Sequence, residues 1–178
     1  VLQWRQQRPD IIYIISKDIL RHRRAQKEDA VWLKKGEEYK DETLSVRAFG
    51  STDVGVSFLL QASGKKIFHA GDLNNWHWMD ESTEAEWKGA EKNFLHELDD
   101  LYAYTPEVDV AMFPVDPRLG KEYMRGAGQF VTKIKTHIFV PMHFTPEYAK
   151  ANAFRDFAEA HGVRFVSLTH RGQKIEIE

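Results

Sequence analysis

The second half of the chain alternates short apolar runs with longer amphipathic segments, and this alternation limits the possible fold more than any other feature. Residues 108–113 and 137–141 are apolar runs rich in β-branched and aromatic residues, which is typical of buried strands. Between them, the apolar side chains of residues 121–135 recur at three- and four-residue steps, as on one face of a helix. Strand–helix–strand order favours a sheet with helices against it, so we predict an α/β domain.

The first half of the chain has the pattern of antiparallel strands. Residues 44–49 alternate apolar and polar side chains, and the runs 54–61 and 66–69 are joined by Ala62-Ser63-Gly64-Lys65, which favours a hairpin turn. We therefore expect one mixed sheet. Periodicity predicts further elements: a strand at 10–15 buried on both faces, helices at 2–8, 17–27, 87–102 and 147–161, and strands at 163–168 and 173–177.

Composition narrows the classes of function. The 178 residues suit one domain, 1–178, and 25 basic against 27 acidic residues give a net charge of −2. This balance argues against nucleic acid and anionic membranes as partners, so a small-molecule substrate is expected. The basic cluster at residues 21–24 is interpreted as a solvated helix face. No apolar run approaches the ~20 residues of a membrane span, and a cytoplasmic protein is predicted.

Two strand ends carry side chains that can bind a metal. The chain has no cysteine, so any metal would be held by histidine and carboxylate. Asp72 follows a strand and Gly71, and His143 ends another strand 71 positions later. Ligands in α/β folds bind at the carboxyl ends of strands, where these two side chains could converge. Taken singly, each has an ordinary alternative, because Gly-Asp is common in turns and a lone histidine is often structural.

The order of four segments resembles the metallo-β-lactamase-fold hydrolases, in particular the branch related to ascorbate-6-phosphate lactonase. The segments are residues 50–58, 66–72, 109–118 and 139–144. The resemblance implies an αββα sandwich, in which mixed sheets are flanked by helices. It also implies that Asp72 bridges two metal ions and that His143 binds the second one.

The sequence departs from this family in two ways. The motif His-x-His-x-Asp-His, which supplies three or four ligands, is not in the sequence, and we expect a domain that is N-terminally incomplete and lacks strands. The family's third histidine is replaced by Gly50-Ser51-Thr52-Asp53, where Asp53 is either an oxygen ligand or part of a polar turn. His69, next to the Gly-Asp motif, is expected to support a ligand or to lie in the core.

Three more residues are candidates for substrate binding. Asp116 and Arg118 lie on a loop at the same edge of the sheet, where they either orient a substrate anion or ligand or form a local salt-bridged turn. Trp76, in Trp76-His77-Trp78, is either an aromatic wall over the pocket or part of a packed loop or subunit interface. Both pairs of interpretations stay open.

The resulting hypothesis is a metal-dependent hydrolase that uses metal-activated water on a small-molecule ester, lactone or phosphoester. Two zinc ions are expected in the complete protein, with manganese as the other candidate. This chain by itself is expected to bind metal poorly, to turn over little or nothing, and to form a homo-oligomer that covers an apolar face. The alternative is a non-catalytic α/β module for binding or oligomerisation that has lost its metal site.

Overall fold

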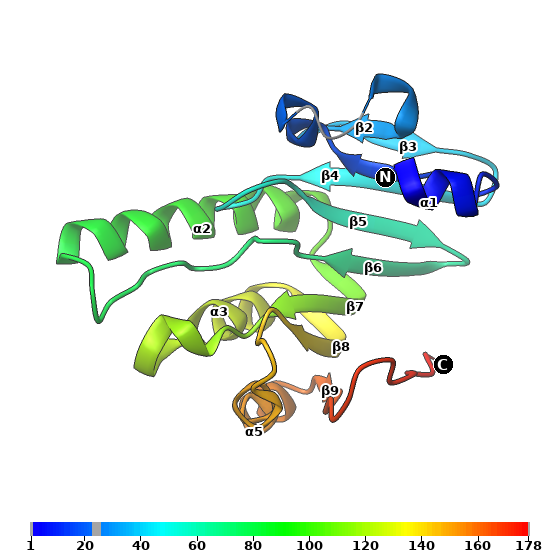
Figure 1. Ribbon diagram of the computed structural model, residues 1–178. Helices are drawn as coiled ribbons and strands as arrows, with labels where there is room; N and C mark the ends of the chain where they lie inside the picture. Colours follow the sequence, from blue (N-terminus) through cyan, green and yellow to red (C-terminus); the bar gives the residue numbers. More distant parts are fainter. Residues whose placement is uncertain (1, 23–25, 178) are drawn as a thin grey trace.

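One mixed sheet organises the structure, a computed structural model that describes residues 2–22 and 26–177 (Figure 1). Its strand order follows the sequence from β3 to β9. The antiparallel part consists of β3 (Glu38–Lys40), β4 (Leu44–Phe49), β5 (Ser57–Ala62) and β6 (Lys65–His69). The parallel part continues from β6 through β7 (Glu107–Pro114), β8 (Lys135–Met142) and β9 (Arg164–Phe165). The expected mixed sheet is therefore confirmed.

The β5–β6 hairpin has the turn that its sequence predicts. Ser63 and Gly64 both have positive φ, at 51° and 75°. A two-residue turn with positive φ at both positions matches the right-handed twist of the flanking strands. The register that follows pairs Leu59 with Phe68 on the core face of the sheet.

Helices cover one face of the sheet and bury the main core against it. They are α2 (Glu84–Tyr104), α3 (Arg125–Lys133), α4 (Tyr148–Asn152) and α5 (Arg155–Ala160). Thr83 caps α2 in a reciprocal arrangement with Glu86, whose carboxylate accepts from the Thr83 backbone N–H at 2.8 Å. Phe113 of β7 lies at the centre of this core, with its ring 4.6 Å from that of Phe130 on α3.

The other face of the sheet has thinner cover. β1 (Ile14–Ser16) and β2 (Val31–Leu33) form a separate parallel pair, and Leu33 packs against Val46 and Ala48 of β4. The segment after β9 contributes apolar side chains to a cluster over β7 and β8. In the described part of the chain, no helix is long and apolar enough to cross a membrane.

Several predicted elements are corrected. Residues 10–15 are not a strand buried on both faces, because β1 begins at Ile14 and Ile12 is 58% exposed. The helix expected at 17–27 is a 3-10 helix, Lys17–His22, followed by a second one, Lys27–Asp29. Residues 23–25, which include Arg23 and Arg24 of the basic cluster, lie outside the described residues. The last predicted strand, at 173–177, is irregular. A short run of β-branched residues resembles a strand whether or not it enters a sheet. Only hydrogen-bonded pairing with a neighbouring strand separates a true strand from an irregular segment.

A polar network joins α2, α3 and the loop after β6. The Glu91 carboxylate of α2 accepts from Arg125 Nε at 2.7 Å and from Asn75 Nδ2 at 3.3 Å. Gln129 donates to the same oxygen. The hydrogen bond from Arg125 is the main reason that the pKa of Glu91 lies below its ordinary value. The charged form of Glu91 is therefore favoured by folding.

Replacing Glu91 by Gln is expected to lower the free energy of unfolding by about 1–2 kcal/mol near neutral pH. Because the pKa of Glu91 is lowered by folding, its contribution is complete above about pH 4.3 and is lost as the pH falls through the lower folded value. Urea unfolding at about pH 7 and about pH 3 should show a smaller deficit at the lower pH. Glu84→Gln, on the same helix with a 72% exposed side chain, is the control and should change little. Equal effects of the two substitutions would contradict a specific stabilising contribution of the ionised Glu91 carboxylate.

Candidate functional site

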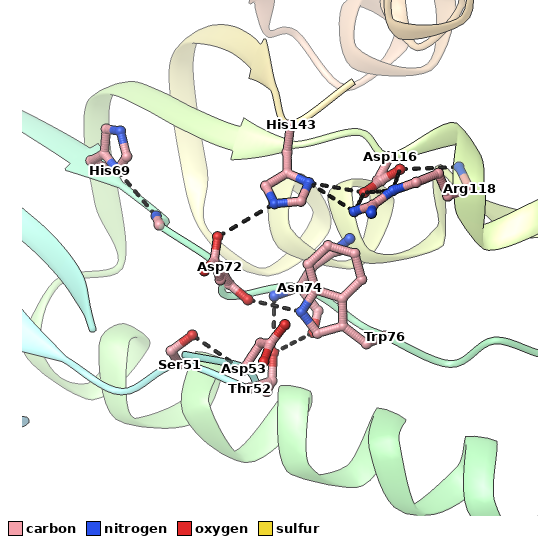
Figure 2. Close-up of polar contacts among 11 residues, drawn as sticks. Ser51, Thr52, Asp53, His69, Asp72, Asn74, Trp76, Asp116, Arg118 and His143 are labelled. Carbon is pink, nitrogen blue, oxygen red and sulfur yellow. Dashed lines mark hydrogen bonds and ion pairs between the residues drawn. The ribbon is translucent and has the colours of Figure 1, made fainter. Parts of the chain in front are cut away.

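The candidate site lies where three neighbouring parallel strands end (Figure 2). Asp72 follows β6, Asp116 follows β7, and His143 follows β8. In an α/β sheet, loops at this edge carry ligand-binding groups because the parallel strands all present their carboxyl ends there. The structure brings these three residues together, as the sequence predicted for Asp72 and His143.

A tight turn positions Asp72. Gly71 has φ of +57°, and a Cβ at this position would lie 2.8 Å from the Val56 carbonyl oxygen, so a side chain is excluded both by conformation and by space. His69 accepts a hydrogen bond from the Gly71 N–H through Nδ1 at 3.1 Å. His69 is exposed and holds the turn beside Asp72, so the expectation of a core position is wrong and that of local support is consistent with the contact.

His143 is held in an uncommon backbone conformation with φ of +64°. Its Nε2 lies 3.4 Å from Asp72 Oδ1, and its Nδ1 lies 2.9 Å from Asp116 Oδ2. An ionised carboxylate only accepts hydrogen bonds, so Nδ1 carries a proton and donates to Asp116. In the neutral imidazole, Nε2 then directs its lone pair towards Asp72.

Asp116 is 1% exposed and is the buried anchor of the site. Burial alone would raise its pKa, but hydrogen bonds from Arg118 and His143 outweigh burial, and the pKa of Asp116 lies below its ordinary value. Arg118 Nε lies 3.0 Å from each carboxylate oxygen of Asp116. The local Asp116–Arg118 salt bridge, one of the two open interpretations, is therefore present, and the Arg118 side chain is 60% exposed at the site.

The pair formed by Asp72 and His143 has the donor chemistry of a zinc site. Ligand atoms about 2.05 Å from a tetrahedral zinc ion lie roughly 3.3 Å apart, which is close to the observed 3.4 Å between Oδ1 and Nε2. Within residues 2–22 and 26–177, however, no three His, Asp or Glu side chains gather closely enough to hold a metal ion. The described residues thus place two side chains of ligand type next to each other, without a third close enough to form a metal-binding group.

Asp53 lies on the other side of Trp76 from Arg118 in the view of Figure 2. It lines a pocket of about 420 Å³ with Trp76 and residues of α2, and it does not join Asp72 and His143 in a three-residue cluster. Trp76 connects the two regions. Its ring lies 5.3 Å from the His143 ring, and its Nε1 donates to the Asp72 carbonyl oxygen at 2.8 Å.

Sequence reasoning missed the residues that hold the loop after Asp72. Thr52 Oγ1 donates to the Asn74 carbonyl oxygen at 2.6 Å and accepts from the Asn74 N–H at 3.0 Å. Asn74 is fully buried and packs against Gly126 of α3, where a Cβ would lie 2.0 Å from the Asn74 side-chain oxygen. The Asn74-Asn75 pair beside Asp72 was the available signal, because two adjacent amides in a buried loop need specific partners.

Comparison with known proteins rests on structure. No family model and no curated protein matches the sequence. A Parabacteroides distasonis protein described as a metal-dependent hydrolase aligns with a TM-score of 0.60 at 15% identity, over 88% of this chain and 64% of its own. Igni18, a metallo hydrolase from Ignicoccus hospitalis, aligns with a TM-score of 0.59 at 15% identity, over 94% of this chain and 69% of its own.

The chain has a metallo-β-lactamase-like α/β fold. The large mixed sheet with helices against it confirms the predicted fold class, and the chain spans 64% of the length of the Parabacteroides protein. CmlA, a diiron β-hydroxylase from Streptomyces venezuelae, also aligns, with a TM-score of 0.56 at 11% identity over 88% of this chain and 38% of its own. The metallo-β-lactamase-like fold therefore carries more than one reaction, and function depends on the site.

Replacing Gly71 by Ala is expected to lower the free energy of unfolding by about 2–4 kcal/mol, because a side chain there meets both left-handed strain and a backbone oxygen. Gly64→Ala is the matched control, since Gly64 also has positive φ but has no atom within 4 Å of the added Cβ. That variant should lose only the strain, about 1 kcal/mol. Urea unfolding of both variants separates the two contributions, and equal losses would show that the Val56 contact is unimportant.

Proposed function

We propose that this chain is the greater part of a metal-dependent hydrolase in which Asp72 and His143 bind a divalent ion. The observation that carries the proposal is the 3.4 Å approach of Asp72 Oδ1 and His143 Nε2 at the carboxyl ends of two strands. Zinc suits imidazole and carboxylate ligands, and manganese is the other candidate. When bound, such an ion acts as a Lewis acid that makes water nucleophilic near neutral pH.

The residues of the chain have separate tasks in this proposal. Asp116 accepts a hydrogen bond from Nδ1–H of His143 and so keeps the Nε2 lone pair available for the metal. Arg118 is neutralised in part by Asp116 but stays exposed beside His143, where it can orient the oxygen atoms of an ester, lactone or phosphoester. Trp76 forms the wall of the site opposite Arg118, next to the His143 ring.

Two ligands do not complete a catalytic metal site, which needs three protein ligands in the known zinc enzymes. We therefore propose that this chain binds metal weakly and hydrolyses little by itself. A non-catalytic module is the competing proposal, and it is favoured by the lack of a third ligand among the described residues. Zinc binding tests the metal site on which the hydrolase proposal depends.

Elemental analysis of samples held in excess free zinc is expected to show more metal in the chain than in Asp72→Ala or His143→Ala. His137→Ala is the matched control. His137 lies at the opposite end of β8 from His143, and its 51% exposed side chain pairs with Glu107 of β7. Asp116→Asn should weaken zinc binding by about tenfold to a hundredfold, as expected for a residue that orients a ligand. Zinc binding that survives unchanged in His143→Ala would exclude this site and favour the non-catalytic module.

We also propose that the chain self-associates. Trp4 is 61% exposed and Ile12 is 58% exposed, and contact with a second copy would remove their apolar surface from water. Light scattering should give the mass of a dimer, and Ile12→Lys should shift it towards the monomer. A monomer at all concentrations of the unmodified chain would contradict the proposal.

A further inference from the structure

A pocket of about 420 Å³ adjoins the Asp72–His143 pair and has no role in the proposed metal binding. It lies between the loop at residues 51–53 and the outer side of α2, with Trp76 as the shared wall. Its volume is within the range of small-molecule sites and suits a substituent of several non-hydrogen atoms. A substrate bound at Asp72 and His143 could therefore extend past Trp76 into this pocket.

Apart from His96, the ionisable side chains that line the pocket are acidic. Asp53 and Glu97 contribute carboxylates, and Asn93 and His96 contribute an amide and an imidazole. Neither Lys nor Arg lines the pocket in the described part of the chain. Asp53 and Glu97 are both negatively charged, and the lysine that pairs with Glu97 does not line the pocket, so an anionic substituent would meet negative charge and is disfavoured.

Glu97 is built into the pocket. Its carboxylate lies against Gly50 just after β4, where an added Cβ would come within 2.0 Å of Oε2 and would displace the carboxylate. Lys35 reaches Oε2 of Glu97 at 2.7 Å and also Oδ2 of Asp100 at 2.6 Å. Lys35 is thus shared between Glu97 and Asp100, so Glu97 is only partly neutralised.

We infer that this pocket binds a positively charged amine group of the substrate. Two carboxylates and the face of an indole are the groups that stabilise an ammonium ion, through charge and through cation–π attraction. The inference rests on the proposed function only in assigning the amine to a substrate. Binding of the amine itself needs neither a metal nor catalysis.

Saturation-transfer NMR with three probes of equal chain length tests the inference: n-butylammonium, 1-butanol and butyrate, each with the full chain in EDTA. The ammonium probe should bind at least about fivefold more tightly than the alcohol, and butyrate should bind least. Asp53→Asn and Glu97→Gln should each weaken n-butylammonium binding about threefold to fivefold and leave 1-butanol binding unchanged.

Asp99→Asn is the control, because Asp99 is on the same helix, is 61% exposed and pairs with Lys133 outside the pocket. Equal affinities for the ammonium and alcohol probes, tighter binding of butyrate, or no effect of Asp53→Asn and Glu97→Gln would overturn the inference. Because EDTA removes metal, these outcomes are independent of the zinc measurements. Absence of zinc binding would thus contradict the proposed metal site, and absence of preferential ammonium binding would contradict the inferred amine pocket.

Discussion

The candidate site depends on one buried charge, the carboxylate of Asp116. Removing a carboxylate from water costs several kcal/mol unless hydrogen bonds and opposite charge compensate. Here Arg118 and His143 compensate, and both are thereby fixed at the end of the sheet. The same contact accounts for the positive φ of His143, because backbone strain of about 1–3 kcal/mol persists only where the surroundings determine the conformation.

A second set of contacts fixes the other half of the site. Thr52 and Asn74 exchange two hydrogen bonds, which tie the loop after β4 to the loop after Asp72. Asn75 then joins that loop to Glu91 on α2 and Gln129 on α3. The position of Asp72 is thus set from the helix layer as well as from the end of β6, as precise placement of a ligand requires.

The sequence predicted those parts of the fold in which local pattern and tertiary environment agree. The β5–β6 hairpin followed from Ser63-Gly64, and α2 followed from its spaced apolar residues. The prediction of a strand at residues 10–15 was wrong, because strand pairing begins only at Ile14, where β1 pairs with β2. In the site, strand ends indicated Asp72 and His143, whereas the burial of Asp116 and the pocket beside Glu97 arise from contacts between distant segments. Periodicity contains no information about such contacts.

The two sides of Trp76 differ in charge, and this difference limits how a substrate can lie. On one side, Arg118 keeps an exposed guanidinium whose partner Asp116 is buried, so the surface there attracts oxygen atoms that carry negative charge. On the other side, Asp53 and Glu97 repel them. A molecule that spans both sides must place its reacting oxygen atoms towards Arg118 and a cationic or neutral group beyond Trp76. The fold alone would permit either orientation, so under the two proposals these few charged side chains would set the direction of binding.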